Sequence, residues 1–197
     1  SEMCIRDRDG MRRLATGQSA LLGGKVLIDG QPIHRPMARD QRVAYIAENP
    51  SQMMLFQDMS YLRNLTFCLP RQIDSWFRRR SIYRSLRREL TPELGAVFDK
   101  DIRDLNTQEK YALIFRRVLL QQPRVVFFEQ PFWGNDVLLQ QHIERQVQLL
   151  LAKKIAVVVL IVGIYDAFPL AERTLIYKNG PVSYTHLTLP TKLEVEI

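Results

Sequence analysis

Two short runs of consecutive apolar residues constrain the fold of this chain more than any other feature. Residues 124–128 read Arg-Val-Val-Phe-Phe, and residues 155–162 are apolar throughout. Runs without polar alternation are typical of parallel strands that are covered on both faces of a sheet. The longer run extends to Tyr165 and is too short for a membrane span, which needs about 20 residues. The sequence therefore predicts buried parallel strands and no transmembrane helix.

Two amphipathic helices are predicted around the first of these strands. Residues 106–122 and residues 137–153 carry apolar side chains at helical spacing. Asn106 is placed to cap the first helix, with Glu109 three positions later, which is the pattern of a capping box. The side chains expected to face the core are Tyr111, Ile114, Phe115, Val118 and Leu119 in the first helix and Leu139, Ile143, Val147, Leu150 and Leu151 in the second. Buried strands that alternate with helices indicate an α/β fold with a largely parallel sheet.

Shorter elements are predicted toward both ends of the chain. The expected strands are residues 25–30, which end in an Asp-Gly turn, residues 42–46 and residues 173–177, with a loop at residues 49–60. Residues 61–104 are polar, rich in Arg and mostly helical in character. Proline interrupts helices, so we expect breaks in this segment at Pro70 and Pro92.

The composition is that of a globular chain and excludes some classes of protein. The 197 residues include 28 Lys and Arg against 21 Asp and Glu, which gives a formal charge of +7, and 46% are hydrophobic. The two cysteines, Cys4 and Cys68, exclude a disulfide framework and a Cys-rich metal site. The positive charge permits a nucleic-acid or membrane-surface partner without requiring one.

The two ends of the chain differ from the rest. Residues 183–191 alternate like a strand but follow a complete strand and turn, with nothing expected to pair with them. Residues 1–9 and 183–197 resemble translated sequencing-adapter sequence, and we expect them to be non-native, with protein lost at both termini. Genuine, poorly ordered tails are the alternative.

A carboxylate follows the first buried strand, because Glu129-Gln130-Pro131 comes directly after residue 128. In parallel sheets the ligand site lies at the carboxyl ends of the strands. Phosphate-handling enzymes use an acid at such a place to hold Mg²⁺. An acid that faces solvent at the end of a strand explains the position equally well.

The order and spacing of several segments identify a protein family more specifically than this acid does alone. These segments are Asp29-Gly30, residues 45–50, residues 105–110, residues 117–120, Pro123, the strand into Glu129-Gln130-Pro131, residues 170–173 and Asn179-Gly180. Over residues 11–182 they resemble the ATPase subunit of ATP-binding-cassette (ABC) transporters, although no single motif is intact. The resemblance implies a P-loop NTPase (RecA-like) core of residues 10–58 and 105–182, with an inserted α-helical subdomain at residues 59–104.

In that family two ATPase subunits enclose two ATP molecules, and the resemblance assigns roles to single positions. Glu129 falls at the Asp that binds Mg²⁺ and is one methylene longer. Gln130 falls at the catalytic Glu, and its carboxamide cannot accept a proton from water; losing a general base slows a reaction about 10²- to 10⁴-fold. Glu48 falls at the Gln that reaches Mg²⁺ and the attacking water, and a solvent-exposed loop acid is the alternative there.

The family's signature sequence falls on residues 105–109. Its positions at the partner's nucleotide are Asn106, Thr107 and Gln108, where side chains replace the glycines that allow close approach of a phosphate. A plain capped helix is the alternative. Asp136 matches the acid that couples the two nucleotide sites, and a cap for the following helix explains it equally well.

Two other family elements are missing. The phosphate-binding loop should precede the helix at residues 11–17, and Gly24-Lys25 cannot replace it because Val26 follows and a strand begins there. The switch His is absent from positions 162, 163 and 165. His34 and His142 are interpreted as an ordinary loop residue and a helix-surface residue. We therefore expect weak or absent binding of ATP and Mg²⁺.

The resemblance implies a nucleotide-binding subunit or half-domain of an ABC transporter, with a degenerate and hydrolysis-impaired site. Its partners would be a second ABC ATPase subunit and a membrane permease, in the cytoplasm at the inner face of the cell membrane. Nucleic acid is not expected. The alternative is a non-transporter ABC-type regulatory or nucleic-acid-associated module, and a decayed gene is a third possibility.

An arginine-rich segment lies within the expected helical subdomain. It comprises Arg78, Arg79, Arg80, Arg84, Arg87 and Arg88. Docking to a membrane protein or to anionic headgroups is one interpretation. A solvated helix face is the other.

Overall fold

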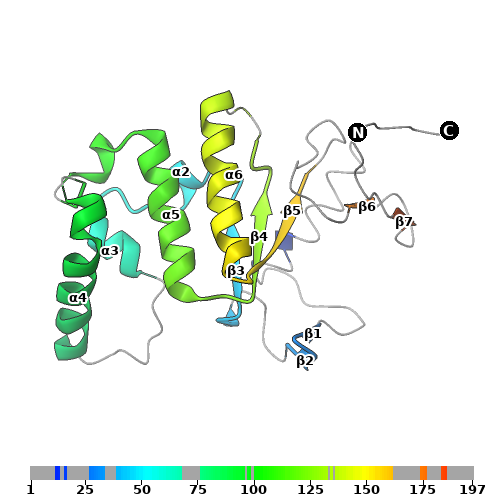
Figure 1. Cartoon of the computed structure of the whole chain (residues 1–197), viewed down its shortest axis with the longest axis horizontal. Coiled ribbons are helices and arrows are strands. Elements are labelled where there is room, and N and C mark those ends of the chain that lie inside the picture. Colours follow the sequence, from blue (N-terminus) through cyan, green and yellow to red (C-terminus); the bar gives the residue numbers. More distant parts are fainter. Residues whose placement is uncertain are drawn as a thin grey trace.

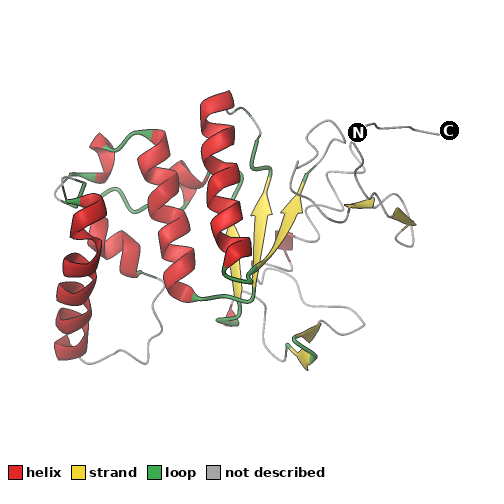
Figure 2. Ribbon diagram, in the orientation of Figure 1, coloured by secondary structure: helices red, strands yellow, loops and turns green. Residues whose placement is uncertain are grey.

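The structure is a computed structural model that describes residues 12–13, 16, 27–33, 39–67, 76–95, 97–98, 100–132, 134, 136–161, 174–176 and 183–185. Within these residues the long helices lie on one side of a parallel sheet, and Figure 1 and Figure 2 show this arrangement. The described helices include none that is both long and apolar enough to cross a membrane.

The sheet has three parallel strands among the described residues. In spatial order they are β3 (Val43–Ile46), β4 (Val125–Glu129) and β5 (Ala156–Leu160). Strand β4 is central and almost wholly buried, which confirms the prediction from its apolar run. The second run was expected to form a buried strand as well, but β5 is only half-buried, and among the described residues it has a neighbour on one side alone.

Helices α5 (Thr107–Gln121) and α6 (Val137–Ala152) cover one face of the sheet. Phe115 of α5 meets Phe128 of β4 edge to face, with ring centroids 5.7 Å apart. The buried side chains of α6 are Leu139, Ile143, Val147 and Leu150. Leu151 was expected to face the core and is instead 43% exposed. At about 3.6 residues per turn it lies roughly 100° around the helix from Leu150.

A smaller apolar cluster covers the opposite face of the sheet. Val43 and Phe127 are buried there, with Tyr45, Val158 and Leu160 packed against them. A hairpin of β1 (Leu27–Ile28) and β2 (Gln31–Pro32) contributes Ile28 to this cluster. The hairpin turns at Asp29 and Gly30, both with positive φ (52° and 72°), as the Asp-Gly pair predicts.

Helices α2 (Pro50–Met53), α3 (Tyr61–Thr66) and α4 (Trp76–Leu94) and the 3₁₀ turn η3 (Ile102–Asp104) separate β3 from α5. Helix α2 lies in a segment that was expected to be a loop. The break expected at Pro92 is also wrong, because α4 continues past it to Leu94. A proline this close to a helix end removes only one of the last backbone hydrogen bonds. Pro70 lies outside the described residues.

Helix α3 packs against α5 and shares its core. Asn64 of α3 is fully buried; its Oδ1 accepts from Phe56 N–H at 2.8 Å and its Nδ2 donates to Phe56 O at 2.9 Å. Tyr61 meets Phe98 edge to face at 5.4 Å. Helix α3 therefore packs into the same hydrophobic core as α5 and the face of the sheet that α5 covers.

A last strand pair is formed by β6 (Thr174–Ile176) and β7 (Ser183–Thr185). The two strands are antiparallel, with Leu175 beside Tyr184. The expectation that nothing pairs with the strand-like segment after residue 182 is therefore wrong. A local pattern shows that a segment alternates but does not identify its partner strand.

Candidate functional site

The carboxyl edge of β3 and β4 brings together three of the predicted site residues. Ile46 lies beside Phe128 in the parallel register, so Glu48 and Gln130 each follow this pair by two positions. Glu129 is the last residue of β4. Glu48 is half-buried at the turn between β3 and α2. The sheet therefore places these polar side chains at one edge, where ligands of parallel sheets bind.

Glu129 is held by a residue of the neighbouring strand. Successive residues of a strand point to opposite faces, so Glu129 shares the face of Phe127, away from α5 and α6. Tyr45 lies beside Phe127, which makes Glu129 its diagonal neighbour. The Tyr45 hydroxyl donates a hydrogen bond to Glu129 Oε2. Because Glu129 is only 4% exposed, this donor stabilises a carboxylate that has little contact with water.

Gln130 is fixed by its backbone immediately after β4. Its N–H donates to Leu160 O at 2.8 Å, which extends the β4–β5 ladder by one residue. Its φ of 45° is in the left-handed region, so the chain changes direction at this residue. It is 7% exposed. A buried neutral carboxamide therefore occupies the position where the resemblance expects a general base.

The described residues do not by themselves form a metal site. They contain no group of three or more His, Cys, Asp or Glu side chains that could hold an ion. At the sheet edge the acid oxygens come from Glu129 and Glu48, and Glu129 Oε2 is already engaged by Tyr45. Mg²⁺ commonly takes one or two carboxylates and completes its octahedral shell with water and phosphate oxygens. The edge therefore offers at most part of such a shell.

Asp136 begins helix α6. Its Oδ1 accepts a hydrogen bond from Leu139 N–H at 2.8 Å, which caps the helix. Gly134, two residues earlier, has a φ of 69° that a side chain would disfavour. The structure thus bears out the capping explanation for this acid.

The signature positions lie on the first turn of α5. Asn106, Thr107 and Gln108 are all exposed. Asn106 Oδ1 accepts from Glu109 N–H, and Glu109 Oε2 accepts from Asn106 N–H, both at 2.8 Å. This is the predicted capping box. Two of the amides that a bound phosphate would need are therefore already occupied by the protein's own side chains.

Lys100 adds a second partner to this turn. Its Nζ lies 2.8 Å from Glu109 Oε1, so both oxygens of Glu109 are engaged. The Lys100 ammonium and, second, the Asn106 N–H lower the pKa of Glu109 below its usual value. Negative charge from Glu109 therefore stays at the start of α5, where it would oppose a phosphate.

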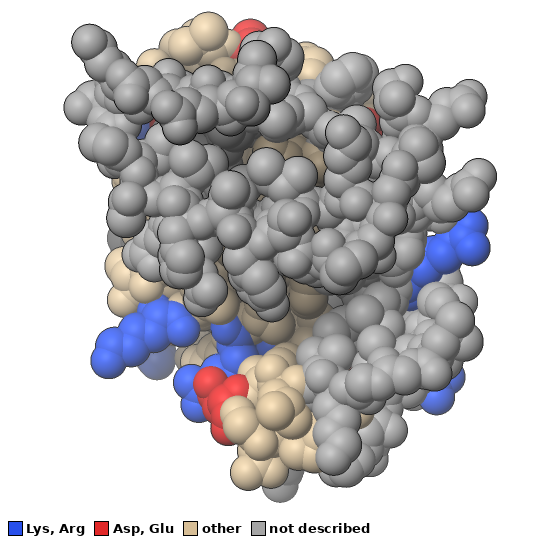
Figure 3. All heavy atoms as spheres, turned by 90° about the vertical axis from the view of Figure 1, so that its right-hand side faces the viewer, with Lys and Arg blue, Asp and Glu red and all other residues tan. Residues whose placement is uncertain are grey.

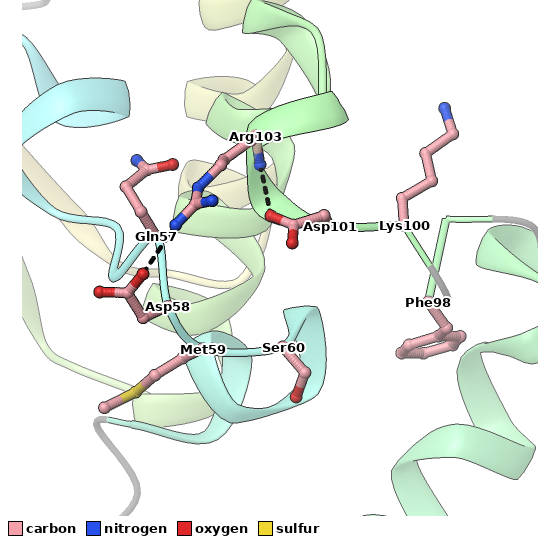
Figure 4. Close-up of a pocket in the computed structure, with 8 residues that line it drawn as sticks. All are labelled: Gln57, Asp58, Met59, Ser60, Phe98, Lys100, Asp101 and Arg103. Carbon is pink, nitrogen blue, oxygen red and sulfur yellow. Dashed lines mark hydrogen bonds and ion pairs between the residues drawn. The ribbon is translucent and has the colours of Figure 1, made fainter.

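A hollow of about 600 Å³ opens beside this turn. Figure 4 shows the residues that line it, which are Gln57, Asp58, Met59, Ser60, Phe98, Lys100, Asp101 and Arg103. Arg103 bridges its two sides, with Nη2 at 2.8 Å from Asp58 Oδ1 and its backbone N–H at 3.0 Å from Asp101 Oδ1. None of the predicted nucleotide-site residues lines this hollow.

Three residues that organise these regions were not singled out from the sequence as parts of the site. They are Tyr45, Lys100 and Arg117, whose buried guanidinium donates to Met54 O at 2.8 Å and so ties α5 to the end of α2. Only Tyr45 could have been found from the sequence, because the alternation of side chains along a strand places it on the same face of the sheet as Glu129. The other two depend on contacts between distant segments.

His142 was interpreted as a helix-surface residue and is instead half-buried. Its Nε2 is buried and has no hydrogen-bond partner among the described residues. Burial, followed by the charges of Arg145 and Arg116, lowers its pKa. Gly24-Lys25, His34 and the three candidate positions for the switch His (162, 163 and 165) lie outside the described residues.

Comparison with known proteins supplies relatives of low identity. A putative ribose/galactose/methyl galactoside import ATP-binding protein of Pseudomonas fluorescens is 24% identical over 83% of this chain and 33% of its own length. The molybdenum import ATP-binding protein ModC of Mycobacterium tuberculosis is 28% identical over 82% of this chain and 44% of its own length. The chain thus spans less than half the length of these relatives, and no family model matches it.

The fold itself has solved counterparts. CbiO1 of Clostridium perfringens, part of the ABC transporter complex CbiONQ, superposes with a TM-score of 0.57 at 16% identity, over 77% of this chain and 61% of that chain. The parallel sheet covered by helices matches the α/β architecture expected from the sequence. The chain is therefore related in sequence to ATP-binding subunits of ABC transporters and has the fold of an ABC ATPase.

Proposed function

We propose that this chain is the nucleotide-binding subunit or half-domain of an ABC transporter and that its own nucleotide site is hydrolysis-impaired. ATP and Mg²⁺ are the ligands that the relatives suggest. In this proposal the chain contributes structure or regulation to the transporter more than turnover. A second, more competent ATPase subunit would supply most of the hydrolysis.

The observation that carries the proposal is the identity of the residue that follows Glu129. The register of β3 and β4 supports the alignment of Glu129 with the Mg²⁺-binding acid and of Gln130 with the catalytic base. Gln130 has no basic oxygen that could take a proton from water. Gln130 retains a hydrogen-bonding amide, so in this proposal any nucleotide that the chain binds, weakly as expected, is held without rapid hydrolysis.

The start of α5 gives independent support for an impaired nucleotide site. Its capping box and the Lys100–Glu109 ion pair occupy groups that a partner's nucleotide would contact. We therefore propose that the composite site to which this turn contributes is weakened as well. Asn106, Thr107 and Gln108 remain the candidate contacts, with Asp136 as the candidate coupling residue.

Exposed aromatic side chains support a protein partner near the end of β3. The rings of Phe56 and Phe67 are in contact, with centroids 4.4 Å apart and planes tilted by 49°, and the two residues are 40% and 55% exposed. Large apolar side chains that are paired and exposed are typical of interaction sites. We propose a membrane permease as this partner, which would place the chain in the cytoplasm against the inner face of the cell membrane.

The division into parts also belongs to this proposal. Residues 10–58 and 105–182 would form the ATPase core, residues 59–104 the helical subdomain, and residues 1–9 and 183–197 would be non-native. In this division no segment of residues 10–182 supplies the phosphate-binding loop. An experiment on hydrolysis therefore needs a variant that carries such a loop.

The test compares ATP hydrolysis in the presence of Mg²⁺ before and after Gln130→Glu. Both proteins would carry the phosphate-binding segment of a CbiO-type relative ahead of residue 11, and binding of a fluorescent ATP analogue would be measured in parallel. We expect nucleotide binding without turnover in the parent, and a gain of about 10²- to 10⁴-fold in rate after the substitution.

Gln140→Glu is the matched control, because it adds the same charge on α6 outside the predicted site. It should leave the low hydrolysis rate unchanged. Rapid hydrolysis by the parent protein would refute the impaired site. Failure of both proteins to bind the nucleotide would argue for the non-transporter alternative.

A further inference from the structure

A row of arginines follows one side of helix α4, and the proposed transporter role does not use it. Its members are Arg80, Arg84, Arg87 and Arg88, and all four are exposed. At about 3.6 residues per turn, these positions fall within roughly 100° of one another around the helix axis. We call this set the arginine row.

The opposite side of α4 faces the protein. Ile82, Tyr83 and Leu86 are half-buried there. The Tyr83 hydroxyl accepts a hydrogen bond from Thr66 Oγ1 of α3 at 3.1 Å. Figure 1 places α4 at the outer margin of the helices. The exposure of the four arginines and the partial burial of Ile82, Tyr83 and Leu86 indicate that the row lies on the outer side of α4.

The charge along this row is of one sign. Glu89 is exposed, but its helical position lies about 150° from the centre of the row. From the first to the last arginine the row extends about 12 Å along the axis. On the face of the molecule seen in Figure 3, the described Lys and Arg side chains lie toward the two margins, and those at the lower left lie next to an acidic side chain.

We propose that the arginine row binds an anionic phospholipid surface. Guanidinium groups pair with phosphate oxygens through two parallel hydrogen bonds, which makes Arg well suited to phosphate groups. A straight row on a long helix can face a flat layer of headgroups along its length. The proposal requires neither ATP nor a permease and is independent of the proposed function.

The neighbours of the row favour a lipid over single-stranded nucleic acid. Proteins that bind single strands interleave aromatic side chains with their basic residues, so that bases can stack. The exposed residues next to the row are Ser81 and Ser85. Among the residues of α4 whose side chains the structure describes, the aromatic one is Tyr83, and its contact with Thr66 turns it toward α3.

The test measures binding of the whole chain to vesicles of phosphatidylcholine mixed with phosphatidylglycerol, and to vesicles of phosphatidylcholine alone. We expect binding to the mixed vesicles only, and its loss at high salt because exposed charges are screened. Since each Arg near an anionic surface adds about fivefold to binding, Arg84→Gln with Arg88→Gln should weaken partition roughly 30-fold. Arg84→Lys with Arg88→Lys should retain most of the binding.

Lys153→Gln with Lys154→Gln is the matched control, because it removes the same charge from the exposed turn after α6. Circular dichroism would verify that α4 persists, which we expect since Gln is a good helix former. An equal loss of binding in the control would overturn the proposal in favour of net charge alone. Tighter binding to duplex DNA than to the mixed vesicles at the same salt concentration would overturn it as well.

Discussion

The carboxyl edge of β4 and the first turn of α5 depart from the ABC ATPase pattern in two different ways. At the edge, Glu129 and Gln130 are buried, and in the proposed alignment a carboxamide stands where a carboxylate is expected. At the first turn of α5 the residues are exposed, and side chains occupy amides that glycines would leave open in the same alignment. In this proposal one region lacks a chemical group and the other lacks access for a phosphate.

The two departures therefore differ in how easily a substitution could restore the family's residues. A single change, Gln130→Glu, would restore a carboxylate to the edge. At α5 the capping box stabilises the helix itself, so opening the amides would also weaken the fold. Four substitutions test these two regions, and we give them from the largest expected effect to the smallest, with the last two acting on the same ion pair.

Tyr45→Phe should have the largest effect on stability. It removes the donor to Glu129 and leaves a buried carboxylate without that hydrogen bond, which costs about 1 to 3 kcal/mol. Urea denaturation at neutral pH would measure the loss in the free energy of unfolding. Tyr83→Phe is the control, since its half-exposed hydroxyl contacts Thr66 where water can replace it. Equal stability of the parent and Tyr45→Phe would show that the edge does not depend on this contact.

Asn106→Ala should have an intermediate effect. It removes the side-chain cap of α5, and such a loss costs about 1 kcal/mol, whereas Asn106→Gly should cost only a few tenths. Thermal unfolding would measure both variants beside Thr107→Ala, an exposed neighbour that caps nothing. If Thr107→Ala were as destabilising as Asn106→Ala, the cap would not be what stabilises this turn.

Glu109→Gln should have the smallest effect, and that effect should depend on pH. The folded-state pKa of Glu109 is below its usual value of 4.5, so its contribution to stability is present above that pH and is lost as the pH falls through the lowered pKa. The variant should therefore be less stable than the parent at neutral pH, with the gap closing in acid. Melting temperatures across this range would measure the gap.

Lys100→Gln offers a second route to the same result. It removes the first cause of the lowered pKa, so its gap from the parent should close over the same pH range. A gap that stays constant from neutral to acid pH in both variants would contradict the role of this ion pair.

The local elements of this chain were predictable from the sequence. Strand β4 was recognised because buried parallel strands lack polar alternation, and its central place in the sheet agrees with this. The capping box was recognised because it connects residues only three positions apart. For the same reason the position of Glu129 at the end of its strand was correctly inferred.

The contacts between distant segments were not predictable in this way. The pairing of Tyr45 with Glu129 joins residues 84 positions apart, and that of Lys100 with Glu109 depends on the path of the chain before α5. The strand at residues 173–177 and the alternation of β7 were both recognised from the sequence, but the pairing of the two strands was not. Helix α4 continues past Pro92 where local propensity predicted a break.

The sequence by itself thus determined strand β4, helices α5 and α6 and the polar residues at their ends, because hydrophobic periodicity and helix capping act over a few residues. The tertiary structure decided what those polar residues do. It placed a tyrosine hydroxyl on the buried acid, buried Gln130 beside it, and closed the first turn of α5 with Lys100. The burial and pairing of these polar side chains depend on residues brought together from distant parts of the chain, and no local pattern encodes them.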